Sequence, residues 1–249
     1  MFKKKIISKT QFLKLNKKYA KLMQENIKLK KNALKVFVEA DKYRWIHQNL
    51  WMGEPVLNLP EDLFIIQDII FRTRPDYIIE TGVAWGGSSL FYSMLLDYFG
   101  GKKYIGIDTF LPKNVTQALK KHKKLYKKIS LIKGDSTSEE TILKIRKLIN
   151  NSKKILVILD SHHTHQHVLK ELNLYSNFVK KGNYLICGDT IVNDIPDQKH
   201  RPREWNKKNN PQTALNSFLK SKKRKFKIDY EIYRKLLFSN QPKGYLIST

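Results

Sequence analysis

The chain has 249 residues, with 48 Lys and Arg against 22 Asp and Glu, which makes its formal net charge +26. Its hydrophobic fraction of 41% is close to that of packed globular proteins and argues against disorder. The single cysteine, Cys187, excludes a disulfide scaffold and fits a reducing compartment, and no run of about 18 apolar residues predicts a membrane span. The basic N-terminus lacks an apolar stretch and a cleavage signal, so we expect a cytoplasmic protein.

Residues 1–50 are rich in lysine and contain neither Gly nor Pro, which predicts a basic helical extension before a domain at 51–249. Apolar residues follow a heptad pattern in which the steps alternate between 3 and 4. The positions are Phe12, Leu15, Tyr19, Leu22, Asn26, Leu29, Ala33 and Val36. The pattern suits a helix packed on its own domain, a short coiled coil whose register Asn26 sets, or a basic helix on an anionic membrane.

Helical and strand patterns alternate from residue 58 onward. The predicted helices are 58–74, 88–99, 115–126, 138–150, 165–180 and 211–221, and the predicted strands are 77–81, 103–108, 129–133, 154–160, 183–187, 236–239 and 244–248. This alternation predicts a doubly wound α/β fold with a mostly parallel sheet, which two antiparallel strands close at the C-terminus. The run Ile155–Leu159 is apolar without alternation, as expected of a strand that is buried on both faces.

A loop rich in small residues follows the first of these strands. Gly82, Ala84, Gly86 and Ser88 lie between the strand and the next helix, where small side chains and free backbone N–H groups let a ligand approach closely. Glu80, at the end of the strand, would repel a diphosphate but suits a cationic ligand. The segment is therefore a candidate cofactor loop, although a tight structural turn explains the same pattern.

Acidic residues follow four further predicted strands. Asp108 is placed to hold ribose hydroxyls, and Asp135 to border an adenine, because ligands of parallel α/β sheets bind at the carboxyl ends of the strands. Asp160 and Asp189 end two later strands, and two carboxylates at one edge can hold Mg²⁺. Each of these acids, taken alone, also fits a solvated loop.

Four of the seven histidines lie between residues 162 and 167, directly after Asp160. His163 precedes a predicted helix, whose dipole lowers the pKa of an imidazole and favours its neutral, proton-accepting form. A zinc site would need a third ligand, and solvated surface histidines are the other alternative.

Three segments together resemble the cephalosporin hydroxylase family, and the resemblance covers roughly residues 45–249. They are Pro60-Glu61-Asp62, the stretch Arg74–Gly82 and Gly86-Gly87-Ser88. That family consists of class I S-adenosylmethionine-dependent methyltransferases related to rhamnosyl and macrolide sugar O-methyltransferases. The resemblance implies a Rossmann-like, seven-stranded sheet whose last strand is antiparallel.

The resemblance also implies roles for the residues at the strand ends. Glu80, Gly82 and Gly86 match the methionine end of the cofactor site, Asp108 the ribose acid and Asp135 the residue near adenine. Asp160 and Asp189 match metal ligands, and His163 matches a general base. One position departs from the pattern, because relatives carry an acid where this chain has Gly188, which leaves Asp194 as an alternative ligand.

We therefore predict an O-methyltransferase that acts on a hydroxyl of a sugar or glycan, with His163 and Asp160 as catalytic residues and Mg²⁺ as a possible second cofactor. The loop 189–210, with Arg201, Arg203 and Trp205, is the predicted substrate lid. A homo-oligomer and a peripheral contact between the basic N-terminal helix and an anionic membrane are the further expectations.

The alternatives are a nucleic-acid-binding protein, including an RNA methyltransferase, and a non-catalytic interaction protein. The charge supports a nucleic-acid partner, but only eight of the 48 basic residues are arginine, the residue that base and bidentate phosphate contacts favour. Asp160-Ser161-His162-His163 also replaces the Asn/Asp-Pro-Pro-aromatic motif of amino-group methyltransferases. Both observations argue against nucleic acid.

Overall fold

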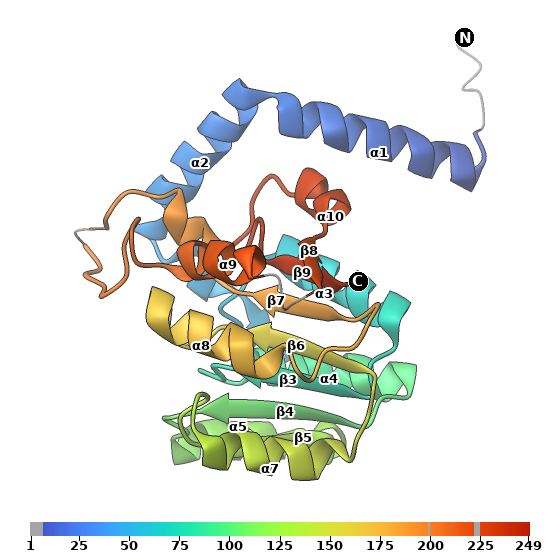
Figure 1. Cartoon of the computed structure of the whole chain (residues 1–249), viewed down its shortest axis with the longest axis vertical. Coiled ribbons are helices and arrows are strands. Elements are labelled where there is room, and N and C mark those ends of the chain that lie inside the picture. The colour runs from blue at the N-terminus through green and yellow to red at the C-terminus, as the bar shows by residue number, and fades with distance from the viewer. Residues whose placement is uncertain (1–6, 199, 222–224) are drawn as a thin grey trace.

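The computed structural model describes residues 7–198, 200–221 and 225–249, and it contains a seven-stranded sheet with helices on both faces (Figure 1). The strands are β3 (Tyr77–Thr81), β4 (Lys103–Asp108), β5 (Ile129–Lys133), β6 (Ile155–Leu159), β7 (Tyr184–Cys187), β8 (Phe226–Ile228) and β9 (Tyr245–Ser248). Their order is β5-β4-β3-β6-β7-β9-β8, and β9 runs antiparallel to both of its neighbours. The predicted fold class, with its antiparallel last strand, is confirmed.

The parallel strands form because their sequences are apolar on both sides. All residues of β3, β6 and β7 are buried, so these three strands form the centre of the core. Thr81 pairs with Ile107 on one side and with Leu159 on the other, which places the carboxyl ends of β3, β4 and β6 side by side. Asp108 ends β4, and Asp160 directly follows β6.

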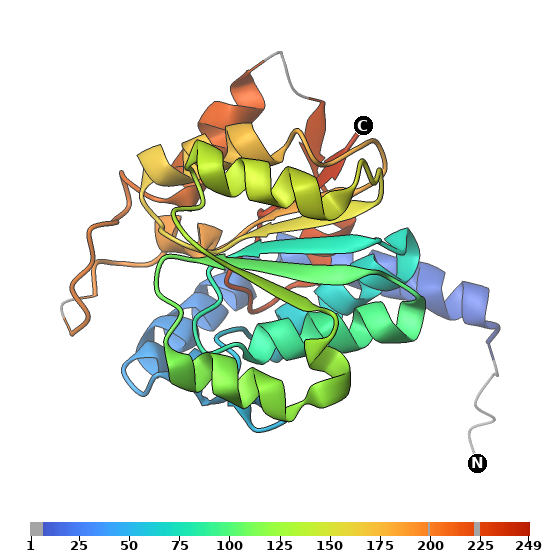
Figure 2. The ribbon, with the colours of Figure 1, turned by 90° about the horizontal axis from the view of Figure 1, so that it is seen from below.

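Two layers of helices cover the sheet, as Figure 2 shows from below. The apolar cluster on one face contains residues of α7 (Glu139–Ile149), α8 (His165–Tyr175) and α9 (Pro211–Lys220). The cluster on the other face contains residues of α3 (Pro60–Thr73), α4 (Gly87–Phe99), α5 (Lys113–Lys121), α6 (Lys123–Tyr126) and α10 (Tyr230–Lys235). The loops at the carboxyl ends of the strands remain free to form a site.

The N-terminal part contains two helices, α1 (Lys9–Glu25) and α2 (Ile27–Asp41), followed by the short helix η1 (Trp45–Gln48) and the hairpin β1 (Leu50–Trp51) and β2 (Glu54–Pro55). The predicted heptad is therefore not continuous, and Asn26 does not set the register of a coil. Asn26 instead caps α2, because its side-chain oxygen accepts the N–H of Leu29 at 3.0 Å.

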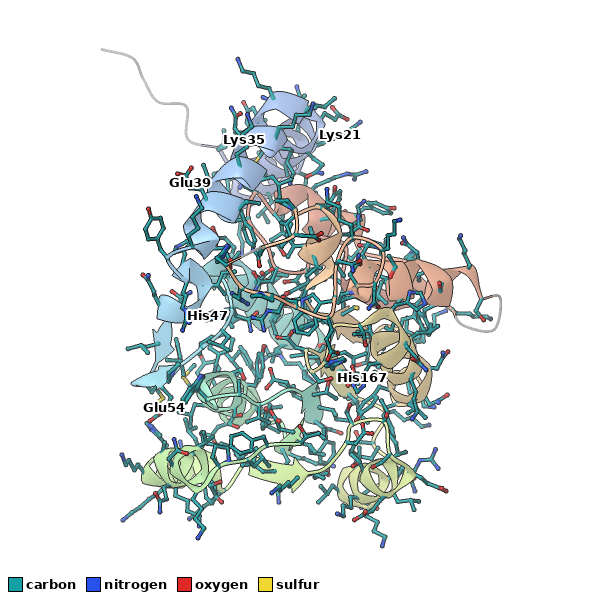
Figure 3. All side chains as sticks on the ribbon, turned by 90° about the vertical axis from the view of Figure 1, so that its left-hand side faces the viewer. Lys21, Lys35, Glu39, His47, Glu54 and His167 are labelled. Atoms are coloured by element: carbon teal, nitrogen blue, oxygen red, sulfur yellow. The ribbon has the colours of Figure 1, made fainter. Side chains whose placement is uncertain are left out.

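The two N-terminal helices differ in how they contact the domain. None of the residues of α1 is buried, and its Lys17 forms an exposed ion pair with Glu231 of α10 at 3.1 Å. Helix α2 buries Phe37 against Leu59 and Ile195. Figure 3 shows the labelled Lys21 and Lys35 on these helices, at the end of the molecule farthest from β4 and β5. Oligomer formation and membrane contact through this extension stay predictions.

Two predicted elements differ from the structure. Residues 236–239 form no strand, and the edge of the sheet is β8, which the sequence analysis did not predict. The reason is the buried Asp62 of α3, whose carboxylate accepts the Ser239 hydroxyl at 2.6 Å and the Asn240 N–H at 2.8 Å and so holds this segment in a bend. The predicted helix 115–126 is broken at His122 into α5 and α6. Among the described helices, none is both long and apolar enough to cross a membrane.

The buried Asp62 makes stability depend on pH. Its carboxylate also accepts the Tyr245 hydroxyl at 2.7 Å, and burial raises its pKa to about 6. A carboxyl whose pKa is higher in the folded chain stabilises the fold below its unfolded pKa, and this stabilisation is lost as the pH rises through about 6.

We expect the wild type to lose about 1 kcal/mol of unfolding free energy relative to Asp62→Asn between pH 5 and pH 8. Urea unfolding of both proteins at the two pH values measures this difference. Glu61→Gln is the control, because Glu61 is an exposed neighbour in the same helical turn and the variant keeps Asp62. The difference in unfolding free energy between this variant and the wild type should stay the same at both pH values. A difference between wild type and Asp62→Asn that stays constant with pH would contradict the prediction.

Candidate functional site

A cavity of about 360 Å³ lies at the carboxyl ends of the parallel strands. Eleven of the thirteen residues that the sequence analysis selected line it: Glu80, Gly82, Ala84, Ser88, Asp108, Asp160, His163, Asp189, Arg201, Arg203 and Trp205. These residues lie at the ends of β3, β4, β6 and β7 or in the segments that follow them. They meet in one cavity because parallel strands end at one edge of the sheet. The two remaining residues, Gly86 and Asp135, do not line the cavity.

The loop after β3 requires glycine at position 82. Gly82 has a φ of +89°, and a Cβ atom there would lie 2.0 Å from the carbonyl oxygen of Asp160. The adjacent ends of β3 and β6 can approach so closely only because this side chain is missing. Gly86 also has a positive φ, of +85°, and directly precedes the first turn of α4. Its role is therefore to start the helix.

We expect Gly82→Ala to destabilise the fold by more than the roughly 1 kcal/mol that a positive φ alone costs alanine. Gly182→Ala is a matched control, since Gly182 has a φ of +81° but no atom within 4 Å of the place that a Cβ would take. Urea unfolding separates the two contributions, because only Gly82→Ala adds a clash with backbone. Equal losses in the two variants would show that the approach of Gly82 to Asp160 is not important.

Glu80 and Asp108 hold the loop from both sides. The buried Glu80 accepts hydrogen bonds from the hydroxyls of Ser88, at 2.9 Å, and Tyr104, and burial raises its pKa to about 7. Asp108 accepts the N–H groups of Val83 at 2.9 Å and Ala84 at 3.2 Å. The backbone of the loop is therefore fixed before any ligand binds.

Asp135 makes contacts within its own turn. Its carboxylate accepts the N–H of Thr137 at 2.7 Å and the hydroxyl of the same residue at 2.9 Å, and the backbone hydrogen bond lowers its pKa. These bonds shape the turn between β5 and α7. The predicted contact with an adenine stays a prediction.

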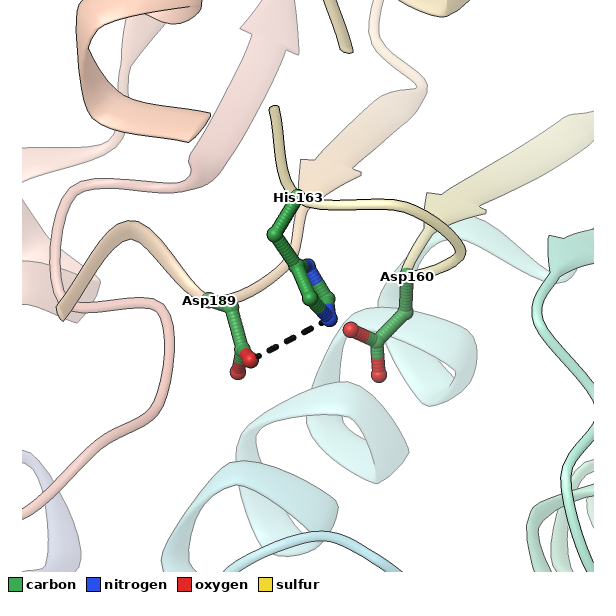
Figure 4. A group of neighbouring side chains, drawn as sticks. All are labelled: Asp160, His163 and Asp189. Carbon is green, nitrogen blue, oxygen red and sulfur yellow. Dashed lines mark ion pairs between the residues drawn. The ribbon is translucent and has the colours of Figure 1, made fainter. Parts of the chain in front are cut away.

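Asp160, His163 and Asp189 form a cluster in which one donor atom from each side chain lies within 4.8 Å of the others. Figure 4 shows the His163 imidazole between the two carboxylates, with Nε2 3.4 Å from Oδ2 of Asp189. Asp160 and Asp189 come from the ends of the neighbouring strands β6 and β7, as predicted.

Burial sets the protonation of this cluster. The pKa of His163 is lowered because the imidazole is desolvated, although Asp189 and Glu171 partly oppose this effect. The predicted direction is thus found, but its cause is burial; His163 lies two residues before α8, which begins at His165. Burial and the charge of Asp189 raise the pKa of Asp160. Both shifts favour the uncharged form of the group, the neutral imidazole of His163 and the protonated carboxyl of Asp160.

The other histidines of the same run have separate partners. His162 Nε2 lies 3.2 Å from Glu204, and His165 Nδ1 lies 2.8 Å from the hydroxyl of Thr213. His167, whose position on α8 Figure 3 labels, lies 3.5 Å from the buried Glu171, which raises its pKa. Of the four, only His163 belongs to the three-residue cluster found among the described residues.

The donor set suits a divalent cation. In the part of the chain that the structure describes, no hydrogen-bond donor reaches the Asp160 carboxylate, and a cation would relieve its repulsion with Asp189. Relatives carry an acid at the position of Gly188. In this chain a side chain there would clash, because a Cβ atom would lie 2.6 Å from Oδ1 of Asp160. Asp194 lines a second cavity, beside Lys30 and Tyr233, and is therefore not an alternative ligand in this arrangement.

Described residues of the loop 189–210 line the cavity, and contacts with His163 and Asp41 hold the loop in place. Trp205 packs edge-on against His163, with ring centroids 4.7 Å apart, and the guanidinium of Arg203 lies 5.1 Å from the Trp205 ring centroid. Arg201 donates a hydrogen bond to Asp41, at the end of α2, at 3.0 Å. The loop thus connects the histidine to the N-terminal part of the chain.

Four polar residues that line the cavity lie outside the segments that the sequence analysis selected for the site: Asp41, His47, Asn58 and Asn240. Figure 3 labels His47, which comes from the segment after α2. These residues lie far from the strand ends in the sequence. Asp41 is one of only three acids in residues 1–50, but no local pattern distinguishes it from a surface residue.

Comparison with known proteins agrees with this geometry. A family model described as Rhamnosyl O-methyltransferase/CmcI matches residues 43–249. A rhamnosyl O-methyltransferase of Mycobacterium leprae is 29% identical over 167 residues, which cover 64% of this chain and 70% of that protein. The Mycobacterium tuberculosis enzyme of the same name is 25% identical over 221 residues, which cover 84% of each chain.

Two solved structures share the fold. CmcI with Mg and SAM has a TM-score of 0.55 and 18% identity, with coverage of 82% of this chain and 77% of that one. A putative caffeoyl-CoA O-methyltransferase from Staphylococcus aureus has a TM-score of 0.54 and 18% identity, with coverage of 94% and 100%.

Proposed function

The chain belongs to the rhamnosyl O-methyltransferase/CmcI family of S-adenosylmethionine-dependent O-methyltransferases, and from this premise we propose that it methylates a hydroxyl group of a sugar or glycan. The observation that carries the proposal is the largely covered imidazole of His163, which lies beside two carboxylates in the same cavity as the glycine loop. A base and a cofactor loop within one cavity are what the transfer of a methyl group to a hydroxyl requires.

The cofactor side of the cavity is formed by the loop after β3. S-adenosylmethionine, when bound, supplies a methyl group that its sulfonium has already activated. Gly82 and Ala84 would let it approach the backbone, and Asp108 would hold the ribose. Glu80 and Ser88 would meet the methionine end, where a carboxylate suits an ammonium group.

On the acceptor side, His163 would remove the proton from the sugar hydroxyl. The hydroxyl oxygen would accept the methyl group that the cofactor supplies, and the proton that it gives up would pass to His163. Its lowered pKa keeps the imidazole neutral and able to accept a proton. Trp205, packed on the imidazole, would limit the positions that the ring can take.

Asp160 and Asp189 would hold a divalent cation beside the acceptor. Bound there, Mg²⁺ would supply positive charge that lowers the pKa of the sugar hydroxyl. His163 lies close enough to be a third ligand, but Mg²⁺ prefers oxygen ligands, which supports the role of base. Arg201, Arg203 and Trp205 belong to the proposed lid over the acceptor.

Calorimetry with S-adenosylmethionine, followed by assays of methyl transfer, tests this proposal. We expect saturable cofactor binding and formation of S-adenosylhomocysteine in the presence of methyl glycosides or glycan fragments. Methylated products identified by mass spectrometry would give the acceptor position. A protein that binds no S-adenosylmethionine, or that methylates RNA in preference to every sugar, would contradict the proposed function.

A further inference from the structure

The cavity is lined by acidic and by basic side chains. Glu80, Asp108, Asp160 and Asp189 lie at the ends of the strands and suit a cationic cofactor and a metal ion. His47, Arg201 and Arg203 also line the cavity, together with the acids Asp41 and Asp197. The two arginines belong to the proposed lid over the acceptor, and the reaction described above gives their charge no role.

One of the two arginines is paired. Arg201 Nη1 donates to Oδ1 of Asp41 at 3.0 Å, and His200 Nε2 lies 2.8 Å from Oδ2 of the same carboxylate. Asp41 is buried, and each of its two carboxylate oxygens contacts a residue of the loop. The Nε–H of Arg201, however, is buried without a hydrogen-bond partner among the described residues. A buried charged donor of this kind is costly unless a ligand satisfies it.

The second arginine is not paired with an acid among the described residues. There Arg203 forms neither a hydrogen bond nor an ion pair, and its guanidinium lies 5.1 Å from the Trp205 ring centroid. Burial and the charge of Arg201 lower the pKa of Arg203, while Asp189 and Asp41 oppose this effect. The two acids therefore offset only part of the positive charge on this part of the cavity wall.

The position of this charge relative to the proposed base is defined by Trp205. Its ring lies close to both His163 and the Arg203 guanidinium, at distances from the ring centroid of 4.7 and 5.1 Å. An acceptor whose hydroxyl meets His163 would thus present a neighbouring substituent to Arg203. Guanidinium groups bind carboxylate and phosphate groups with paired, charge-assisted hydrogen bonds.

We propose that the acceptor is an acidic sugar, whose carboxylate or phosphate group is bound by Arg203 and by the free Nε–H of Arg201 while its hydroxyl meets His163. The inference rests on the proposed function and names the substrate class of that site. A neutral sugar would present no negative charge to Arg203.

Matched pairs of probes test the inference on the complex with S-adenosylhomocysteine. The neutral probes are the methyl glycosides of glucose and galactose, and their acidic counterparts are the methyl glycosides of glucuronic and galacturonic acid. Glucose 6-phosphate and galactose 6-phosphate form the phosphate arm. We expect at least one acidic probe to bind about tenfold or more tightly than its neutral counterpart, and salt to weaken only that binding. The arm with the larger preference identifies the anionic group.

Variants then assign the preference to Arg203. We expect Arg203→Ala to abolish the preference and Arg203→Lys to keep part of it, because a lysine retains the charge but not the paired geometry. Arg203 is exposed, so these variants should fold normally, as circular dichroism can verify. Arg146→Ala is the matched control, since Arg146 is an exposed arginine on α7, outside the cavity.

The outcomes separate the inference from the proposed function. Neutral probes that bind as tightly as acidic ones, or acidic probes that fail to bind a complex that does hold S-adenosylhomocysteine, would overturn the acidic acceptor but leave the methyltransferase proposal. A preference that Arg203→Ala leaves intact would overturn the assignment to Arg203. Failure of the wild type to bind either form of the cofactor would remove the proposed function, and this inference with it.

Discussion

His163→Ala should lower kcat by about 10²–10⁴-fold, the usual contribution of a positioned general base, while the affinity for S-adenosylmethionine stays unchanged. Cofactor binding should survive because Glu80 and Asp108, not His163, form the hydrogen bonds that hold the glycine loop. The measurement is kcat with a methylated sugar as product, together with calorimetry of cofactor binding. Added imidazole should restore part of the activity by occupying the space of the missing ring.

His165→Ala is the control for this variant. His165 belongs to the same run of histidines, but its ring is bonded to Thr213 and it does not line the cavity, so kcat should stay close to the wild-type value. The affinity for Mg²⁺ distinguishes the two roles open to His163. A base can be removed without loss of cation binding, whereas a ligand cannot. Near-wild-type turnover of His163→Ala would exclude it as the base.

The second large effect concerns the two carboxylates. Asp160→Asn and Asp189→Asn should each weaken Mg²⁺ binding and lower kcat by about 100-fold or more, because both negative charges are needed to hold a hard cation. EDTA should inhibit the wild type to a similar extent, and added Mg²⁺ should restore only the wild type. Titration calorimetry with MgCl₂ and steady-state kinetics provide the two readouts.

Asp194→Asn is the control for the carboxylates, since Asp194 follows Asp189 closely in the sequence but lines the second cavity. It should bind Mg²⁺ as the wild type does. Full activity of the wild type in EDTA would leave His163 acting without a cation. Loss of cation binding in Asp194→Asn would instead mean that the loop 189–210 rearranges to bring this residue to the site.

Much of the fold follows from local patterns. The apolar run Ile155–Leu159 and its neighbours predicted a parallel sheet, since such strands must be covered on both faces. The edge strand of that sheet, β8, was harder to predict from the sequence, because it is short and only partly buried. The segment 236–239 resembles a strand in sequence, but the buried carboxylate of Asp62 holds its end in a bend.

The sequence by itself determined the parallel α/β sheet, the glycine loop at Gly82 and the meeting of Asp160 with Asp189. These features depend on periodicity within a segment and on the general rule that parallel strands end at one edge. Only the tertiary structure decided that Gly188 has no room for an acid and that Asp41 holds Arg201 beside Arg203, which has no acidic partner among the described residues. The physical reason is that these contacts join segments up to about 160 residues apart, whose packing leaves no local signal in the sequence.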